Sequence, residues 1–408
     1  MSPNDRRTAG AGRAPLREVV ITHALRTPIG RFMGAFAELS AADLGTSVVK
    51  DVLARSRIDA ARVGELIFGN ARQAGGGPNV ARQISVRAGI PQSVPAYTVN
   101  MACGSGLKAI DLAAEAIQLG RADVVVAGGT ESMSGLPFLL PRMRAGYRLG
   151  HAQVVDAMYQ DGFSCPLADM LMGATAEKLA QELSISRKEQ DEFALASQKK
   201  ARSALDAGRF ATEISPVTVP GRKGETVVER DEHPRPDTTI EGLGKLPAVF
   251  DTKNGSVSAG NSSGITDGAA ALVLMSKSRA AAEGRQPLAR IAGMSWAGVD
   301  PAVMGIGPVP ATKKVLEKTG LSLADIDVIE INEAFAAQVI ACERDLKFDR
   351  DKLNPRGGGI SLGHPIGMSG ARLLLTLAYE MREMGHAFGL ATLCISGGQG
   401  LAVILERE

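Results

Sequence analysis

The chain has 408 residues, more than one ordinary domain, and its 45% apolar residues can form a sizeable buried core. A formal net charge of +2 is too balanced for a dedicated nucleic-acid binder, and no apolar run is long enough to cross a bilayer. We therefore expect a soluble protein that binds neither nucleic acid nor membrane. The four cysteines are widely separated and form no CxxC pair, which predicts no metal site, no disulfide scaffold and a reducing, cytoplasmic location.

The N-terminal part of the chain begins with a polar segment and continues into an α/β pattern. Residues 1–14 are small, polar and basic and lack the apolar core of a secretory signal, so we expect a disordered tail. Residues 42–70 are typical of a helix, a short polar link and a strand that ends at Asn70. A helix over 104–120 and a buried strand at 124–127 are expected next.

A long segment of different composition follows that strand. Residues 131–263 are rich in Pro, Arg, Met and polar residues. They contain one well-marked helix, which begins with a capping box at Ser186 and Glu189 and ends at Gly208. We interpret 131–263 as an inserted loop domain, because insertions of this size are often lids or ligand-binding layers.

The C-terminal part repeats the pattern of the N-terminal part. Residues 311–332 are again typical of a helix, a polar link and a strand, here ending at Asn332. A helix over 369–385 then leads to a strand at 390–395. We therefore predict an α/β protein with two similar halves, each with a central sheet covered by helices. The expected boundaries are 15–130 plus 264–283 for the N-terminal half and 284–408 for the C-terminal half.

The fragment NMACGSGLKAI places Cys103 where a loop becomes a helix. Backbone N–H groups and the helix dipole at such a position favour a thiolate. The glycines that follow let a substrate approach the backbone closely. From this fragment alone, a reactive nucleophile and a buried structural cysteine both remain open.

Two fragments of the second half carry groups suited to acid–base chemistry. In GGGISLGHPIGMSGAR, His364 has nothing bulky beside it to pack against, which favours a general base or hydrogen-bond donor over a core residue. The same fragment lacks the GK[ST] of a P-loop, so a nucleotide phosphate site is disfavoured. Cys394, in LATLCISGGQG, ends a buried strand. The repeat places these two residues and Asn332 on loops that would face Cys103 where the two halves meet.

Together these fragments resemble the thiolase family. The motifs NMACGSGLKA, SAGNSSGITDGAAA, INEAFA, GGGISLGHPIGMSGAR and CISGGQG occur in this order, and the resemblance covers essentially the whole chain. It is greatest to the acetyl-CoA acetyltransferases, also called acetoacetyl-CoA thiolases. It implies a duplicated thiolase-type fold with α-β-α-β-α layers. It also implies an acyltransferase that reversibly condenses two acetyl-CoA into acetoacetyl-CoA and CoA.

The resemblance further implies a role for each catalytic residue. Cys103 would accept the acyl group as the nucleophile, and His364 would be the base that activates it. Cys394 would remove and return a proton of the acceptor acetyl-CoA's methyl group. His364 and a water held by Asn332 would form one oxyanion hole, for the enolate. The backbone N–H groups of Cys103 and Ser396 would form a second, for the tetrahedral intermediate.

The coenzyme A contacts are also implied by the resemblance. Ser263 and Ala259 would contact the pantetheine arm. Arg235 and Phe250 would lie near the nucleotide end, and for Arg235 a solvated loop charge remains open. The acyl pocket would be lined by Leu171, Met172 and Phe335. Acetyl-CoA, acetoacetyl-CoA and CoA are then substrates or products, with no permanently bound cofactor and no metal.

Family members are dimers or tetramers, and the stretch 131–150 resembles the loop that pairs dimers. We therefore expect a homotetramer.

Two departures from the family pattern concern the site itself. Leu171 stands where many acetoacetyl-CoA thiolases have a histidine, which makes the region more apolar and would permit a longer or branched acyl group. Ser396 stands where glycine is usual and would be strained if its backbone needed a positive φ.

Three alternatives remain. Leu171 favours a 3-ketoacyl-CoA thiolase of fatty-acid degradation that acts on longer acyl chains. A ketosynthase would share the duplicated fold but use two histidines with its cysteine, whereas Cys394 and the INEAF motif favour a thiolase. A non-catalytic thiolase-like lipid carrier predicts missing catalytic positions, and all four of the expected positions are filled.

Overall fold

The computed structural model describes residues 16–222 and 224–408, so the tail expected at 1–14 lies outside the described residues. Within this part of the chain, ten strands form one mixed sheet. The N-terminal half supplies β1 (Val19–Arg26), β2 (Gly30–Arg31), β3 (Glu65–Gly69), β4 (Ala96–Val99), β5 (Val124–Glu131) and β12 (Thr266–Ser276). The C-terminal half supplies β13 (Ala289–Gly298), β14 (Val328–Ile331), β15 (Phe388–Ile395) and β16 (Gln399–Glu406).

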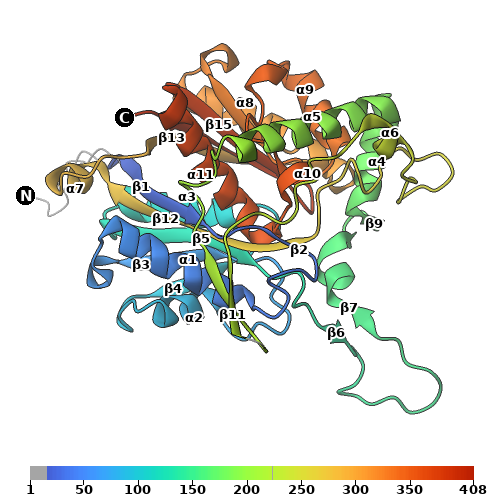
Figure 1. The fold of residues 1–408 in the computed structure, drawn as a ribbon, viewed down its shortest axis with the longest axis horizontal. Coiled ribbons are helices and arrows are strands. Elements are labelled where there is room, and N and C mark those ends of the chain that lie inside the picture. Colours follow the sequence, from blue (N-terminus) through green and yellow to red (C-terminus); the bar gives the residue numbers. More distant parts are fainter. Residues whose placement is uncertain (1–15, 223) are drawn as a thin grey trace, which may run out of the picture.

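The order of the strands is nearly symmetric about the centre of the sheet, which runs β14-β15-β16-β13-β1-β12-β5-β3-β4 (Figure 1). β3 and β5 are parallel, as are β14 and β15. β12 lies antiparallel between β5 and β1, and β16 lies antiparallel between β15 and β13. The halves join where β1 pairs with β13 at only Val20↔Arg290 and Ile21↔Ala289. The predicted duplication is thus confirmed, and the strands of the two halves join edge to edge in one sheet.

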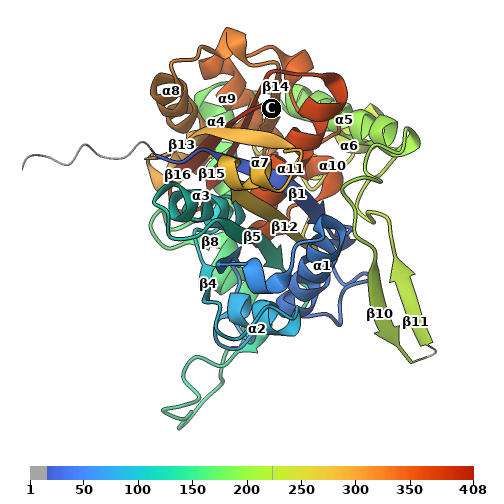
Figure 2. The same cartoon turned by 90° about the vertical axis from the view of Figure 1, so that its left-hand side faces the viewer.

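Helices cover each half outside and lie between the halves inside (Figure 2). The outer helices of the N-terminal half are α1 (Ala41–Ser56) and α2 (Val80–Arg87), and those of the C-terminal half are α8 (Pro308–Thr319) and α9 (Ala336–Leu346). Between the halves lie α3 (Ser105–Gln118) and α11 (Ile366–Met384), with α10 (Gly359–Leu362) just before α11. Three large apolar clusters, two outer and one central, correspond to these layers. The α-β-α-β-α arrangement is therefore confirmed.

The two central helices touch through glycine at their N-terminal ends. A Cβ atom on Gly106 of α3 would lie 2.6 Å from the carbonyl oxygen of Gly367 in α11, and one on Gly370 would lie 2.6 Å from the backbone nitrogen of Leu107. Only glycine allows two backbones to come this close. The N-terminal ends of α3 and α11 are thereby held together, and with them the loops that precede each helix.

Two elements extend beyond the sequence-based expectation. α11 begins at Ile366 rather than at 369, because its first turn is buried against the other half and the glycines there serve packing instead of forming a loop. β5 continues to Glu131 rather than ending at 127. Its Gly129 lies so close to α11 that a Cβ there would be 1.9 Å from the Gly367 carbonyl oxygen. Only glycine fits at this position of the strand. Tertiary packing in both places outweighs the local tendency of glycine to end an element.

The segment between β5 and β12 forms small elements around the two halves. Its helices are α4 (Met172–Glu182), α5 (Arg187–Asp206) and α6 (Ile240–Gly244). Its strand pairs are β6 (Phe138–Leu139) with β7 (Val155–Asp156), β8 (Ser164–Cys165) with β9 (Met170–Leu171), and β10 (Val217–Gly221) with β11 (Gly224–Val228). The expected capping box of α5 is present at Ser186 and Glu189. α7 (Lys277–Ala282) connects β12 to β13. No helix of the described residues is long and apolar enough to span a membrane.

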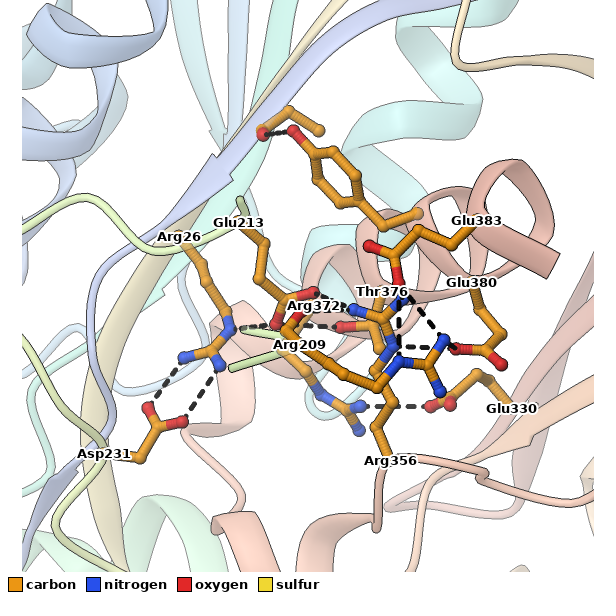
Figure 3. Close-up of polar contacts among 12 residues, drawn as sticks. Arg26, Arg209, Glu213, Asp231, Glu330, Arg356, Arg372, Thr376, Glu380 and Glu383 are labelled. Atoms are coloured by element: carbon orange, nitrogen blue, oxygen red, sulfur yellow. Dashed lines mark hydrogen bonds and ion pairs between the residues drawn. The ribbon is translucent and has the colours of Figure 1, made fainter. Parts of the chain in front are cut away.

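A buried ion-pair network ties this segment to both halves (Figure 3). Arg26 of β1 binds Glu213 at 2.6 Å and Asp231 at 2.7 Å, and all three side chains are fully buried. Arg356 binds Glu380 of α11 at 2.8 Å and lies 3.9 Å from the same Glu213. Glu213 therefore lies between one arginine from each half and links the segment to both.

Candidate active site

A cavity of about 860 Å³ opens at the N-terminal ends of α3 and α11. Residues from both halves and from the segment between β5 and β12 line it. The structure brings every predicted site residue except Asn332 to its wall: Cys103, Leu171, Met172, Arg235, Phe250, Ala259, Ser263, Phe335, His364, Cys394 and Ser396. Asn332 lies directly behind the wall, in hydrogen-bond contact with His364.

Cys103 is held on a strained turn that leads into α3. The preceding residue, Ala102, has a φ of 44°, which an alanine rarely adopts. Its backbone N–H donates to the side chain of Asn100 at 3.0 Å. Ser105 accepts from the Met101 N–H at 2.9 Å and donates to the Ala102 carbonyl at 2.6 Å. These bonds fix the turn and direct the half-buried Cys103 into the cavity.

The surroundings of Cys103 favour the neutral thiol in the free protein. Burial raises the pKa of the thiol, while the Arg72 guanidinium and the backbone N–H groups of Ser396 and Cys103 act in the opposite direction. A thiol of this kind becomes a nucleophile only when a base takes its proton during the attack. The two N–H groups are the pair expected to form the second oxyanion hole.

The hydrogen bonds of His364 fix its imidazole in the tautomer whose Nε2 can accept a proton. Its Nδ1 lies 2.5 Å from the Ser369 hydroxyl oxygen, and that hydroxyl donates to the Pro365 carbonyl at 2.9 Å. Ser369 can therefore only accept from His364, which places the imidazole proton on Nδ1. The opposite atom, Nε2, lies 3.3 Å from the Asn332 amide nitrogen and accepts from it. Burial, reinforced by Arg372 and Arg72, lowers the pKa of His364 to about 3, so the ring is neutral.

Asn332 follows the end of β14 and is fully buried. Its backbone N–H donates to the Thr392 carbonyl at 3.1 Å, which fixes it against β15. Its side-chain oxygen Oδ1 has no protein hydrogen-bond partner in the described part of the chain. A buried amide oxygen of this kind is a natural acceptor for a water molecule. This arrangement is compatible with the expected water-holding role.

Cys394 lies at the end of β15, next to its last residue, and is fully buried, yet it forms part of the cavity wall. It packs with Met304 and Ala334, and Met172 and Phe335 pack against this group. Burial, together with the proximity of Cys103, raises the pKa of Cys394 well above its ordinary value. Cys394 is therefore a neutral thiol that can give a proton to a strongly basic carbon or oxygen.

The strain considered for Ser396 is absent. The backbone with positive φ in this loop belongs to the next two residues, Gly397 at 86° and Gly398 at 84°. Ser396 is not among the residues with positive φ, so a serine fits here without backbone cost. The N–H of Ser396 remains directed at Cys103.

The outer part of the cavity is built by the residues expected to contact coenzyme A. The rings of Phe250 and Phe335 pack edge to face with centroids 6.1 Å apart. The Ser263 N–H donates to the Ala334 carbonyl at 2.9 Å. The backbone of Arg235 is fixed by Gln198 at 2.9 Å, and its side chain is exposed at the mouth of the cavity. Its position suits either a phosphate contact or a solvated charge.

Two residues of the site were not found from the sequence. Ser369 fixes His364 from one turn further along the chain, and Arg72 lines the cavity beside Cys103. The internal repeat offered one signal for Arg72, since it follows Asn70, the counterpart of Asn332. Among the described residues, no group of three His, Cys, Asp or Glu side chains is arranged to hold a metal ion.

Known proteins resemble this chain over nearly its whole length. The family profile described as "Thiolase, N-terminal domain" matches residues 19–278, and "Thiolase, C-terminal domain" matches residues 285–407. The chain is 52% identical to an acetyl-CoA acetyltransferase of Escherichia coli strain K12, over 96% of this chain and 100% of the relative. It is 51% identical to one of Pseudomonas aeruginosa, again over 96% and 100%.

Solved structures give the same result. The crystal structure of the Bacillus anthracis acetyl-CoA acetyltransferase is similar with a TM-score of 0.95 and 46% identity, over 97% of this chain and 100% of that chain. Human mitochondrial 3-ketoacyl-CoA thiolase is similar with a TM-score of 0.93 and 42% identity, over 97% and 100%.

Proposed function

The chain belongs to the thiolase family, and from this premise we propose that its cavity condenses two acetyl-CoA into acetoacetyl-CoA and CoA, and catalyses the reverse thiolysis. The enzyme is an acyltransferase of the thiolase type with coenzyme A thioesters as substrates. One observation supports the roles proposed for Cys103, His364 and Cys394. A neutral imidazole, fixed with Nε2 as the acceptor, opens onto the same cavity as two protonated thiols.

The first half-reaction is acyl transfer to Cys103. His364 Nε2 takes the thiol proton as the sulfur attacks the thioester carbonyl. The backbone N–H groups of Cys103 and Ser396 stabilise the negative oxygen of the tetrahedral intermediate. CoA leaves as a thiol, and the acyl group remains on sulfur as a thioester. Because one thioester replaces another, the step is nearly isoenergetic and reversible.

The second half-reaction forms the carbon–carbon bond. Cys394 first gives its thiol proton to His364 Nε2, and the resulting thiolate removes a proton from the methyl group of the second acetyl-CoA. The resulting enolate oxygen is stabilised by the Nε2–H that His364 now carries and by a water bound to Asn332, whose Oδ1 has no protein partner in the described residues. The enolate carbon attacks the acyl carbonyl on Cys103, and the Cys103 sulfur leaves and takes the proton from His364.

Several finer points belong to the same proposal. The cavity contains the groups needed for this chemistry, so we propose that no permanently bound cofactor takes part. A homotetramer is supported by the 131–150 stretch, and a cytoplasmic location by four dispersed, unpaired cysteines. Leu171 lines the cavity and keeps the longer-chain activity of a 3-ketoacyl-CoA thiolase as a second candidate.

The test is a comparison of thiolysis and condensation by the purified enzyme. We expect turnover of acetoacetyl-CoA, a mass increase of one acetyl group after acetyl-CoA is added, and loss of both in Cys103→Ala. The matched control is Cys165→Ala, which removes a buried cysteine outside the large cavity and should keep the acetyl adduct. A Cys103→Ala variant with full turnover would disprove the mechanism. The ratio of kcat/KM for acetoacetyl-CoA and 3-ketohexanoyl-CoA decides between the two candidates.

A further inference from the structure

Arg72 is a buried arginine that the proposed mechanism does not use. Only 7% of its surface is exposed, and it lines the cavity together with Cys103. Its Nε atom is buried without a hydrogen-bond partner, and no carboxylate of the described residues forms an ion pair with its guanidinium. Buried charges in proteins are normally paired, so a free guanidinium in a cavity wall calls for a partner from outside the chain.

The nearest carboxylate does not supply that partner. Both oxygens of Glu131 are occupied by other donors. Oε1 accepts from the side chain of Asn70 at 2.6 Å and the backbone N–H of Arg72 at 3.0 Å, and Oε2 accepts from the N–H groups of Ala71 at 3.1 Å and Gly367 at 2.8 Å. The Arg72 guanidinium favours the charged form of Glu131 from a distance but does not bind it. The terminal nitrogens Nη1 and Nη2, unlike the covered Nε, stay available to the cavity.

The position of Arg72 identifies which part of a substrate it would meet. A Cβ atom on Gly162 would lie 2.5 Å from Nε and 2.7 Å from Cζ, so the guanidinium packs against the Tyr159–Phe163 turn. Phe163, Met133 and Ile366 form the adjoining apolar wall, and Cys103 packs against the same group. Arg72 therefore lies at the acyl end of the cavity, near the nucleophile, whereas Arg235 is at the mouth.

We propose that Arg72 binds a carboxylate at the far end of the acyl chain, so that the enzyme also cleaves 3-ketoacyl-CoA thioesters of dicarboxylic acids. This inference rests on the proposed thiolase function and names a substrate class for it. An apolar wall that ends in a forked cation suits a short methylene chain ending in a carboxylate. Leu171 adds a further apolar side chain to the wall of the same cavity.

The reaction is balanced with groups already assigned. The Cys103 thiol gives its proton to His364 as the sulfur attacks the 3-keto carbonyl, and the bond between C2 and C3 breaks. The acetyl-CoA fragment leaves as an enolate and takes a proton from Cys394. The dicarboxylic acyl group stays on Cys103 with its free carboxylate toward Arg72, and His364 returns its proton to Cys394. His364 then takes the thiol proton of a second CoA, which accepts the acyl group as a thioester, and passes that proton to the leaving Cys103 sulfur. No oxidant, reductant or metal enters the balance.

The test compares three substrates that differ only at the far end of one acyl chain. They are 3-ketoadipyl-CoA, its terminal methyl ester and 3-ketohexanoyl-CoA. For the wild-type enzyme we expect kcat/KM of thiolysis to be about 10- to 100-fold higher for the acid than for the ester, because the ester cannot pair with a guanidinium. A wild-type ratio of one or below would overturn the proposal without any variant.

Variants then assign the effect to Arg72. Arg72→Met should bring the acid-to-ester ratio close to one, and Arg72→Lys should keep an intermediate ratio. Arg31→Met, which removes another arginine of the cavity wall, should keep the wild-type ratio. Equal losses on acid and ester in Arg72→Met would mean that Arg72 serves Cys103 rather than the substrate, and would refute the proposal. Wild-type turnover of acetoacetyl-CoA, measured in parallel, reports the thiolase function separately.

Discussion

The Nδ1 atom of His364 lies 2.5 Å from the hydroxyl oxygen of Ser369 in the first turn of α11. Because this hydroxyl already donates to the Pro365 carbonyl, it acts on the imidazole only as an acceptor. One serine thereby decides which ring nitrogen carries the proton and which one can take the proton of Cys103. Ser369 is a positioning residue that acts on the reaction through His364.

Replacing Ser369 with alanine should slow thiolysis. In Ser369→Ala the Nδ1–H of a buried imidazole loses its acceptor, which costs about 1–3 kcal/mol, so kcat/KM should fall roughly 10- to 100-fold. The pH dependence of kcat/KM should also change, since the tautomer with Nδ1 free becomes accessible. The matched control is Ser361→Ala, which removes a buried serine of α10 that does not touch the imidazole. Equal losses in both variants would contradict the positioning role.

The protonation states of Cys103 and His364 predict a distinctive pH profile. Burial raises the pKa of Cys103 and lowers that of His364 to about 3, so the free enzyme holds a neutral thiol beside a neutral imidazole. Alkylation of Cys103 by iodoacetamide should then rise about tenfold per pH unit from pH 6 to 9, following the thiolate fraction. A rate that is already high and flat near pH 6 would instead indicate a thiolate–imidazolium pair. Cys103→Ala provides the background rate.

His364 also links stability to pH. Its pKa is lowered on folding from 6.5 to about 3, so the unfolded chain binds the extra proton first. Its contribution to the free energy of unfolding is therefore complete above pH 6.5 and is lost as the pH falls from 6.5 toward 3. Thermal melts between pH 7.5 and 5 should show a steeper decline for the wild type than for His364→Gln. Parallel declines would mean that other groups dominate.

Replacing Cys394 with serine should separate the two half-reactions. A serine hydroxyl is far less acidic than the thiol, so it cannot generate the base that deprotonates the acceptor methyl group. Acyl transfer to Cys103 does not need this base. In Cys394→Ser, exchange of labelled CoA into acetyl-CoA should persist while condensation falls by at least about 100-fold. Equal loss of exchange and condensation would show that the role assigned to Cys394 is wrong.

The sequence predicted the residues that meet at the candidate site, but it did not predict the neighbouring residues that orient or surround them. The glycine-rich surroundings of His364 favour it from local rules, whereas the fragment around Cys103 leaves its role open and only the repeat and the resemblance select it. The internal repeat added Asn332 and Cys394. Ser369 and Arg72 were missed, because their importance depends on which groups lie beside them in space. Arg72 in particular lies in a polar stretch that is typical of an ordinary loop.

The fold shows the same division between local and long-range information. The two halves and their layers follow from periodicity, and the structure confirms them. The early start of α11 at Ile366 and the extension of β5 to Glu131 depend on contacts between glycines of different helices and strands. The ion pair of Arg26 with Asp231 joins residues 205 positions apart, and nothing in the sequence pairs these charges.

That ion pair is predicted to matter for stability. Arg26 lies fully buried between the carboxylates of Asp231 and Glu213 (Figure 3). Arg26→Met removes the cation and leaves two buried carboxylates without it, and breaking a buried pair in this way costs about 3–5 kcal/mol. The melting temperature and the half-life at elevated temperature should both fall clearly. Catalysis per folded molecule should change less, because Arg26 does not line the cavity.

An exposed arginine provides the matched control for this last prediction. Arg202 pairs with Asp206 on the surface of α5 at 2.6 Å, and both side chains are about half exposed. Arg202→Met should leave the melting temperature nearly unchanged, because water screens and replaces such a pair. The difference between the two variants isolates the effect of burial. If Arg26→Met melted no earlier than Arg202→Met, the network in Figure 3 would not be what holds the inserted segment to the two halves.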